Sequence, residues 1–77
     1  MKKVVIYTTP TCTYCKQTKD FFKENSISYE EYDVASDMDK RKEMVEKSGQ
    51  MGVPVIFVDD QMFVGFDKEG LSQALGL

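Results

Sequence analysis

The two cysteines of this 77-residue chain stand three positions apart, in Cys12-Thr13-Tyr14-Cys15. An apolar run typical of a strand precedes them and a segment with helical periodicity follows, so we expect the pair at a helix N-terminus. The unpaired N–H groups and the positive dipole end at such a position favour a thiolate. Cys12 is therefore expected to be an exposed nucleophile, with Cys15 more shielded and within disulfide reach. Two such thiols can pass two electrons to another disulfide.

Two other interpretations of this cysteine pair stay open. Tetrahedral zinc takes about four ligands, and the chain has no histidine and no third cysteine. Zinc or an iron–sulfur cluster would therefore need a second chain or an outside thiol. A purely structural disulfide would close a very small loop and constrain the unfolded chain little. The leading hypothesis is a redox-active dithiol without a bound metal or cofactor, and the main alternative is a dimeric iron–sulfur or zinc carrier.

Composition narrows the class of protein. A chain of 77 residues with 42% apolar and 30% charged residues indicates one globular domain over residues 1–77, expected as a monomer. The net charge is only −3, and basic residues alternate with acidic ones, as in 40–43. This pattern is typical of a solvated helix and does not indicate a nucleic-acid partner. No membrane span or signal peptide is recognisable, so two cysteines without an export signal predict a cytoplasmic protein.

The apolar pattern predicts seven elements in the order βαβαββα. The expected strands are 3–8, 27–34, 53–58 and 61–64. The first expected helix is 13–24. The second begins at a cap supplied by Ser36 or Asp37 and runs to Ser48, and the third follows Asp67. The second strand carries Glu30 and Glu31, which break its alternation, so we expect it at a sheet edge. A right-handed first βαβ unit makes the first two strands parallel, and the last two strands form a hairpin.

The two longer helices are expected to bury one face each. Residues expected to face the core are Cys15, Thr18, Phe21 and Phe22 in the first helix and Met38, Met44 and Val45 in the second. Residues expected to point largely to solvent are Lys16, Lys19 and Lys23.

Three motifs give the chain a family resemblance over essentially its whole length. They are Tyr7-Thr8-x-x-x-Cys12-x-Tyr14-Cys15-Lys16, Ser48-Gly49-Gln50-x-x-Val53-Pro54 and Gly65-Phe66-Asp67. With these motifs the chain resembles the glutaredoxin family of the thioredoxin superfamily. The resemblance implies an α/β, thioredoxin-like fold with a four-stranded mixed sheet in the order 2-1-3-4 and three flanking helices. It also implies a cis peptide bond before Pro54, facing the cysteine turn.

The same resemblance implies a thiol–disulfide oxidoreductase that takes part in electron transport and cell redox homeostasis. Cys12 would be the nucleophile and Cys15 the resolving thiol. Glutathione would be the cosubstrate, and the substrates would be protein disulfides and glutathionylated proteins. The residues expected near glutathione or the sulfur are Thr9, Thr11, Thr13, Tyr14, Gln50, Val53, Pro54, Gly65, Phe66 and Asp67. Lys16 is expected to support the thiolate, and the hydroxyls of Thr11 and Thr13 to donate hydrogen bonds to it.

Three positions depart from the pattern of the family. Thr9 stands where a lysine is usual, Gln50 where a basic residue is frequent, and Phe66 where a second glycine is usual. These changes remove positive charge and add bulk where the glutathione anion would lie. They favour glutaredoxin-like redoxins that thioredoxin reductase reduces, including donors to ribonucleotide reductase, whereas Tyr14 and Lys16 favour a glutaredoxin proper. Glutathione is the expected donor, and thioredoxin reductase stays open as the alternative.

Overall fold

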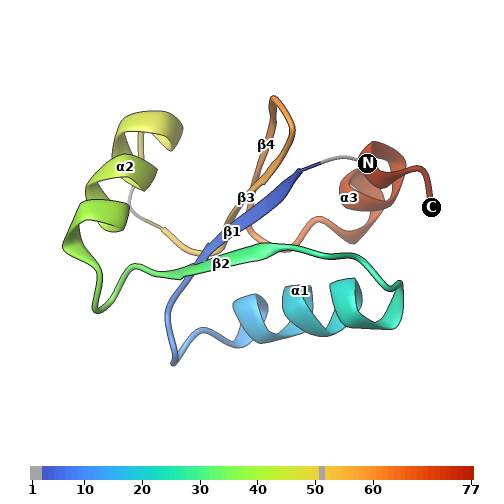
Figure 1. Cartoon of the computed structure of the whole chain (residues 1–77), viewed down its shortest axis with the longest axis horizontal. Coiled ribbons are helices and arrows are strands. Elements are labelled where there is room, and N and C mark those ends of the chain that lie inside the picture. The colour runs from blue at the N-terminus through green and yellow to red at the C-terminus, as the bar shows by residue number, and fades with distance from the viewer. Residues whose placement is uncertain (1–2, 51) are drawn as a thin grey trace.

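The computed structural model describes residues 3–50 and 52–77 and shows the elements in the expected order (Figure 1). The elements are β1 (Val4–Thr8), α1 (Thr13–Glu24), β2 (Glu30–Asp33), α2 (Met38–Ser48), β3 (Val55–Val58), β4 (Gln61–Val64) and α3 (Lys68–Leu75). The four strands form one sheet in the order β2-β1-β3-β4. β1 is parallel to β2 and antiparallel to β3, and β3 and β4 are antiparallel. The mixed sheet and the edge position of β2 confirm the expected fold.

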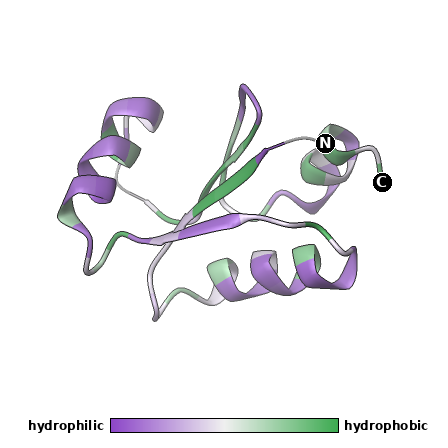
Figure 2. Cartoon of the chain, in the orientation of Figure 1, coloured by the Kyte–Doolittle hydropathy of each residue, from purple (hydrophilic) through white to green (hydrophobic). Residues whose placement is uncertain are grey.

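Alternating side chains of β1 divide the core into two clusters, one on each face of the sheet. Ile6 packs in the cluster that contains Phe22 of α1 and Leu71 of α3. Tyr7 packs on the opposite face in the cluster that contains Met44 of α2. Figure 2 shows the central strand β1 as hydrophobic and the edge strand β2 as hydrophilic, in keeping with their places in the sheet. No helix within residues 3–50 and 52–77 is long and apolar enough to cross a membrane.

The second strand is shorter than the predicted segment 27–34 and covers only Glu30–Asp33. Ile27, the first residue of the predicted segment, instead closes the end of α1. Ser26 adopts a left-handed conformation with φ +56°, and the backbone N–H of Ile27 donates to Phe22 O at 2.8 Å. This hydrogen bond closes the helix C-terminus in the way of a Schellman turn, so Ile27 is not available to the sheet ladder.

The third strand begins at Val55, two residues later than predicted. The Val53–Pro54 peptide bond is cis, as the resemblance implied, and proline has no N–H to donate to a strand ladder. The Pro54 carbonyl accepts a hydrogen bond from the Gly65 amide at 2.8 Å. The loop before β3 is therefore tied directly to the loop after β4. The first strand begins at Val4, one residue after the predicted Lys3.

The second helix confirms most of its predicted signals. Asp37 and not Ser36 is the N-cap, because its side chain accepts from the Lys40 amide at 3.1 Å, and Gly49 ends the helix at φ +73°. Met44 is fully buried, but Met38 is 62% exposed. The prediction that Met38 faces the core was wrong. It lies six positions from Met44, about 1.7 helical turns away, and so on a different side of α2.

The two methionines of α2 give a matched test of this packing. We expect Met44→Ala to lower the free energy of unfolding by about 2–5 kcal/mol, because it opens a cavity in a closed cluster. Met38→Ala should change the same quantity by less than about 0.5 kcal/mol, since its side chain is already in solvent. Urea denaturation of the reduced protein measures both. Equal effects of the two substitutions would contradict the packing of α2 described above.

Candidate active site

A tight turn carries the chain from β1 to α1 and delivers the first cysteine to the helix start. The Cys12 amide donates to the Thr9 carbonyl at 3.3 Å, which closes a four-residue turn. Pro10 occupies the second position of this turn, where its fixed φ is favourable. Because this turn directly precedes α1, it places Cys12 at the helix N-terminus.

Cys12 is itself the N-cap of α1. Its backbone is extended (φ −87°, ψ 114°), and its sulfur accepts a hydrogen bond from the Cys15 amide at 3.1 Å. The Cys12 carbonyl accepts from the Lys16 amide at 3.2 Å and so begins the helical ladder. Serine, threonine or aspartate usually supplies the acceptor at this position, and the first turn of α1 has no acidic residue. The sulfur therefore occupies the place where the free N–H groups and the dipole favour a negative charge.

Cys15 has the opposite environment. Its side chain is fully buried, whereas Cys12 is half-buried, and neither sulfur is in a disulfide. Burial, followed by the hydrogen bond with Cys12, raises the pKa of Cys15 to about 12. A backbone hydrogen bond from Thr9 and the charge of Lys19 act in the other direction. Cys15 is therefore a neutral thiol near pH 7, and Cys12 is the sulfur that an outside disulfide can reach.

The residues next to Cys12 in the turn and in the first turn of α1 form an exposed rim of side chains that carry polar groups. Thr11, Thr13 and Lys16 are exposed, and Tyr14 is 62% exposed. The hydrogen bond at the Cys12 sulfur comes from the backbone, and within the described residues neither threonine hydroxyl donates to it. The rim is open to a substrate, and the roles expected for Tyr14 and Lys16 remain predictions.

The loop before β3 holds the second group of predicted residues. Val53 is half-buried and precedes the buried Pro54. The side-chain amide of Gln50 donates to the Gly52 carbonyl at 3.2 Å, and its oxygen accepts from the Gly52 amide at 2.5 Å. Gln50 therefore stabilises its own loop with both ends of its side chain. Contact of Gln50 with glutathione remains a prediction.

The segment before α3 holds the third group. Gly65 adopts φ +82°, a conformation that favours glycine. The Phe66 ring centroid lies 5.9 Å from that of Phe21, so this side chain packs against α1. Asp67 is the N-cap of α3, because its carboxylate accepts from the Gly70 amide at 3.0 Å. Packing and capping account for Phe66 and Asp67 in the fold, and contact of either residue with glutathione remains a prediction.

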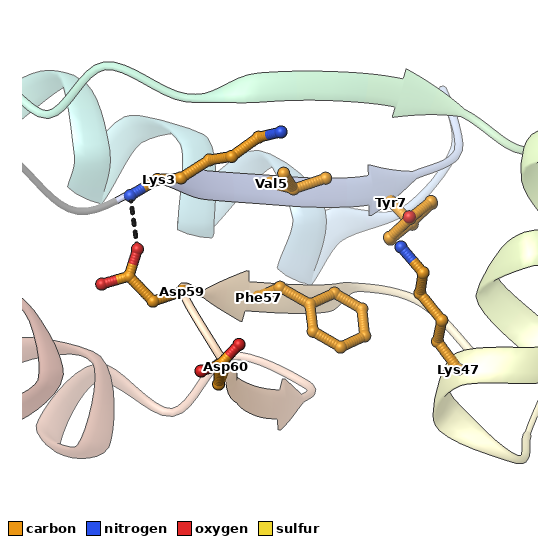
Figure 3. Close-up of a pocket in the computed structure, with 7 residues that line it drawn as sticks. All are labelled: Lys3, Val5, Tyr7, Lys47, Phe57, Asp59 and Asp60. Atoms are coloured by element: carbon orange, nitrogen blue, oxygen red, sulfur yellow. Dashed lines mark hydrogen bonds between the residues drawn. The ribbon is translucent and has the colours of Figure 1, made fainter.

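The cysteines line neither of two surface hollows in the described part of the chain. One of about 450 Å³ lies on the α2 side of the sheet, where the Asp59 carboxylate accepts from the Lys3 amide, and neither cysteine lines it (Figure 3). Its lining residues are Lys3, Val5, Tyr7, Lys47, Phe57, Asp59 and Asp60. The other, of about 240 Å³, runs beside α1 and is lined by Gln17, Asp20, Phe21, Glu24, Phe66 and Lys68. Within the described residues, no group of three or more His, Cys, Asp or Glu side chains is placed to hold a metal ion.

The sequence interpretation missed one polar group near the cysteines. Lys19 was predicted to point largely to solvent, but its Nζ donates to Glu31 Oε2 of β2 at 2.8 Å. Thr8 Oγ1, buried at the end of β1, lies 3.4 Å from the same carboxylate oxygen. The sequence contains a signal for this ion pair. The acidic pair at 30–31 interrupts the alternation of the strand, so one of the two carboxylates lies on the same side of the sheet as α1.

Several known proteins are similar to this chain. The family model for glutaredoxin matches residues 4–64. A glutaredoxin-like 8.6 kDa protein in the rubredoxin operon of Clostridium pasteurianum is 43% identical over 72 residues, which are 94% of this chain and 96% of that protein. Glutaredoxin 3 of Escherichia coli K12 is 39% identical over 67 residues, 87% of this chain and 81% of the relative. A mutant of the thioredoxin-like protein BC3987 superposes with a TM-score of 0.91 at 34% identity, covering 99% of this chain and 97% of that chain.

The capping role of the Cys12 sulfur can be tested through stability. Cys12→Ser keeps an acceptor for the Cys15 amide, whereas Cys12→Ala removes it. We expect the alanine variant to unfold with a free energy about 0.5–2 kcal/mol lower than that of the serine variant. Urea denaturation under reducing conditions measures the difference, with Thr11→Ala as the control in the same turn. Equal stability of the two Cys12 variants would show that the sulfur does not cap the helix.

Proposed function

We propose that this chain, which belongs to the glutaredoxin family, uses its Cys12–Cys15 dithiol to reduce protein disulfides and glutathione mixed disulfides, with glutathione as the electron donor. One observation carries the proposal: an accessible sulfur caps α1, and a buried thiol follows it by one helical turn. Such an arrangement separates a sulfur that attacks from a sulfur that resolves. We place the protein in the cytoplasm, where an isolated cysteine pair stays reduced between turnovers.

Reduction of a protein disulfide takes two exchange steps. The Cys12 thiolate attacks one substrate sulfur, the substrate S–S bond breaks, and the departing thiolate takes up a proton. Cys12 and the substrate are then joined by a mixed disulfide. Cys15 loses its proton and attacks the Cys12 sulfur, which frees the second substrate thiol and leaves a Cys12–Cys15 disulfide. Two glutathione molecules return the pair to the dithiol and leave as glutathione disulfide.

Reduction of a glutathionylated protein needs Cys12 alone. Its thiolate attacks the glutathione sulfur, and the protein thiol leaves. A second glutathione then attacks the mixed disulfide on Cys12, giving glutathione disulfide and the free Cys12 thiolate. Cys15 takes no part in this cycle, because the mixed disulfide is resolved from solution. The two substrate classes therefore differ in their need for Cys15.

Glutathione is an extended peptide with two carboxylates. The loop before β3 can pair with its backbone but offers little positive charge to its carboxylates. Val53 precedes the first residue of β3 by two positions and is half-buried, so its backbone can pair with an extended ligand as a strand does. The basic groups that would bind the carboxylates are missing, since position 9 is threonine and Gln50 is bonded to Gly52. We therefore propose glutathione binding of low affinity.

The same features support a second candidate, a glutaredoxin-like redoxin that thioredoxin reductase reduces. The neutral Thr9 and Gln50 and the bulky Phe66 disfavour a tripeptide anion without hindering a protein partner. A structural relative at 34% identity is itself described as thioredoxin-like. The candidates share the dithiol chemistry and differ only in the molecule that reduces the Cys12–Cys15 disulfide.

Paired coupled assays distinguish the two donors. We expect the oxidised protein to be reduced by glutathione with glutathione reductase, and Thr9→Lys to lower the KM for a glutathionylated substrate by about twofold to fivefold. The reason is a new, partly exposed ion pair with a glutathione carboxylate, worth up to about 1 kcal/mol. Ser28→Lys adds the same charge at an exposed position in the segment before β2 and should leave the KM unchanged. Added salt should shrink the gain.

The cysteine variants complete this test. Cys15→Ser should keep glutathione exchange and lose protein-disulfide reduction, whereas Cys12→Ser should lose both activities. Reduction by thioredoxin reductase alone, together with no effect of Thr9→Lys, would replace the glutathione proposal by the second candidate. Full loss of glutathione exchange in both cysteine variants would contradict the roles assigned to the two sulfurs.

A further inference from the structure

A carboxylate on the edge strand lies where the sheet pattern places an inward side chain. Glu31 of β2 is the register partner of Ile6 in β1, and Ile6 is fully buried in the cluster that includes Phe22 of α1. Cross-strand partners project to the same face of a sheet, so Glu31 projects toward α1. The Glu31 carboxylate on this face stays partly exposed and can pair with a cation from α1.

Lys19 of α1 supplies that charge. Its Nζ donates to Glu31 Oε2 at 2.8 Å, and the two side chains are only 26% and 39% exposed. Thr8 Oγ1, 2% exposed, lies 3.4 Å from the same oxygen. Since Lys19 follows Cys15 by four positions, the two side chains are neighbours on the helix surface. The ion pair therefore fixes a cation within one turn of the buried thiol.

The electrostatic surroundings of Cys15 contain opposing contributions. Among the charged and titratable groups of the described residues, Cys12 disfavours a Cys15 thiolate and Lys19 favours it. Glu31 faces Lys19 from β2 and, chiefly through their hydrogen bond, raises the pKa of Lys19 above its usual value. Because a lysine with a raised pKa stays protonated to higher pH, Lys19 remains a cation throughout the neutral and weakly alkaline range.

We propose that Lys19, held in place by Glu31 and Thr8, promotes the attack of Cys15 on the mixed disulfide at Cys12. The inference rests on the two-step dithiol mechanism proposed above and is independent of the donor. In this step the Cys15 thiol releases its proton to water and its sulfur bonds to the Cys12 sulfur. The bond between Cys12 and the substrate sulfur breaks, and the departing thiolate takes up a proton. The dithiol loses two electrons, and the substrate disulfide gains them.

Lys19 keeps its own proton during this step and acts as a fixed positive charge. It offsets the negative charge that forms on the Cys15 sulfur in a site with little water. Glu31 and Thr8 are positioning residues, since Glu31 holds the Lys19 ammonium group and the Thr8 hydroxyl donates to the Glu31 carboxylate. The first exchange step occurs at Cys12 and should depend on this group much less.

An aromatic disulfide whose leaving thiolate is coloured separates the two steps in a stopped-flow experiment. With one equivalent of reagent, attack by Cys12 releases the first coloured thiolate and attack by Cys15 releases the second. We expect Lys19→Met to slow the second phase about threefold to tenfold near pH 7 and to move its pH profile toward higher pH. The rate of the first phase should change by less than about twofold.

Matched variants separate a charge effect from a structural one. Lys23→Met makes the same change on an exposed position of α1 and should leave both phases unchanged, and Lys19→Arg should restore the second phase. Lys19→Gln repeats the test with a polar side chain if the methionine variant does not fold. An unchanged second phase in the neutral Lys19 variants, or equal slowing by Lys23→Met, would overturn the proposal. The reagent needs neither glutathione nor a reductase, so failure of the proposed donor would leave this result intact.

Discussion

The hydrogen bond between the Cys12 sulfur and the Cys15 amide is the interaction on which the rest of the site depends. It makes the attacking sulfur the cap of α1, so the group that reacts is also the group that completes the helix. The turn from Thr9 to Cys12 fixes where the helix begins. The packing of Phe22 against β1 fixes how the helix lies on the sheet. A sulfur held by these three constraints stays at the positive end of α1 whatever substrate approaches.

The position of the two cysteines at the start of α1 gives them different exposure and therefore different reactivity. Cys12 stands at the last position before the helix and remains accessible, whereas Cys15 turns into the core and is buried. Burial makes a thiolate at Cys15 costly, so the resolving step needs help that the first step does not. Lys19, which pairs with Glu31, is a cation whose charge favours a thiolate at Cys15. The order of the two steps follows from burial and charge.

Much of this structure could be predicted from the sequence because local signals and the sheet pattern agree. The cap at Asp67 and the edge position of β2 follow from residue type and periodicity, which also limit the cap of α2 to Ser36 or Asp37. The sheet order came from the family resemblance. The cis bond at Val53–Pro54 came from the family resemblance and not from periodicity. The agreement extends to the different exposure of the two cysteines, since a helix N-terminus is accessible and the next turn is not.

Predictions missed contacts that residue type and periodicity do not show. The start of β2 was misplaced because Ile27 closes the end of α1 through its amide, a contact that residue type does not reveal. Lys19 was assigned to solvent because helical periodicity does not show that a carboxylate on another strand faces it. Gln50 bonds to Gly52 two residues away, and its expected contact with glutathione remains a prediction.

The division of roles between the two sulfurs is the central claim, and alkylation across a pH series tests it most directly. The folded, reduced protein is treated briefly with iodoacetamide, and each cysteine peptide is quantified by mass spectrometry. Near pH 7 we expect label on Cys12 and almost none on Cys15. Labelling of Cys15 should stay far below that of Cys12 until the solution is strongly alkaline, because burial raises the pKa of its thiol. In denaturant both cysteines should react alike. Equal labelling of the two sulfurs in the folded protein near pH 7 would contradict the account.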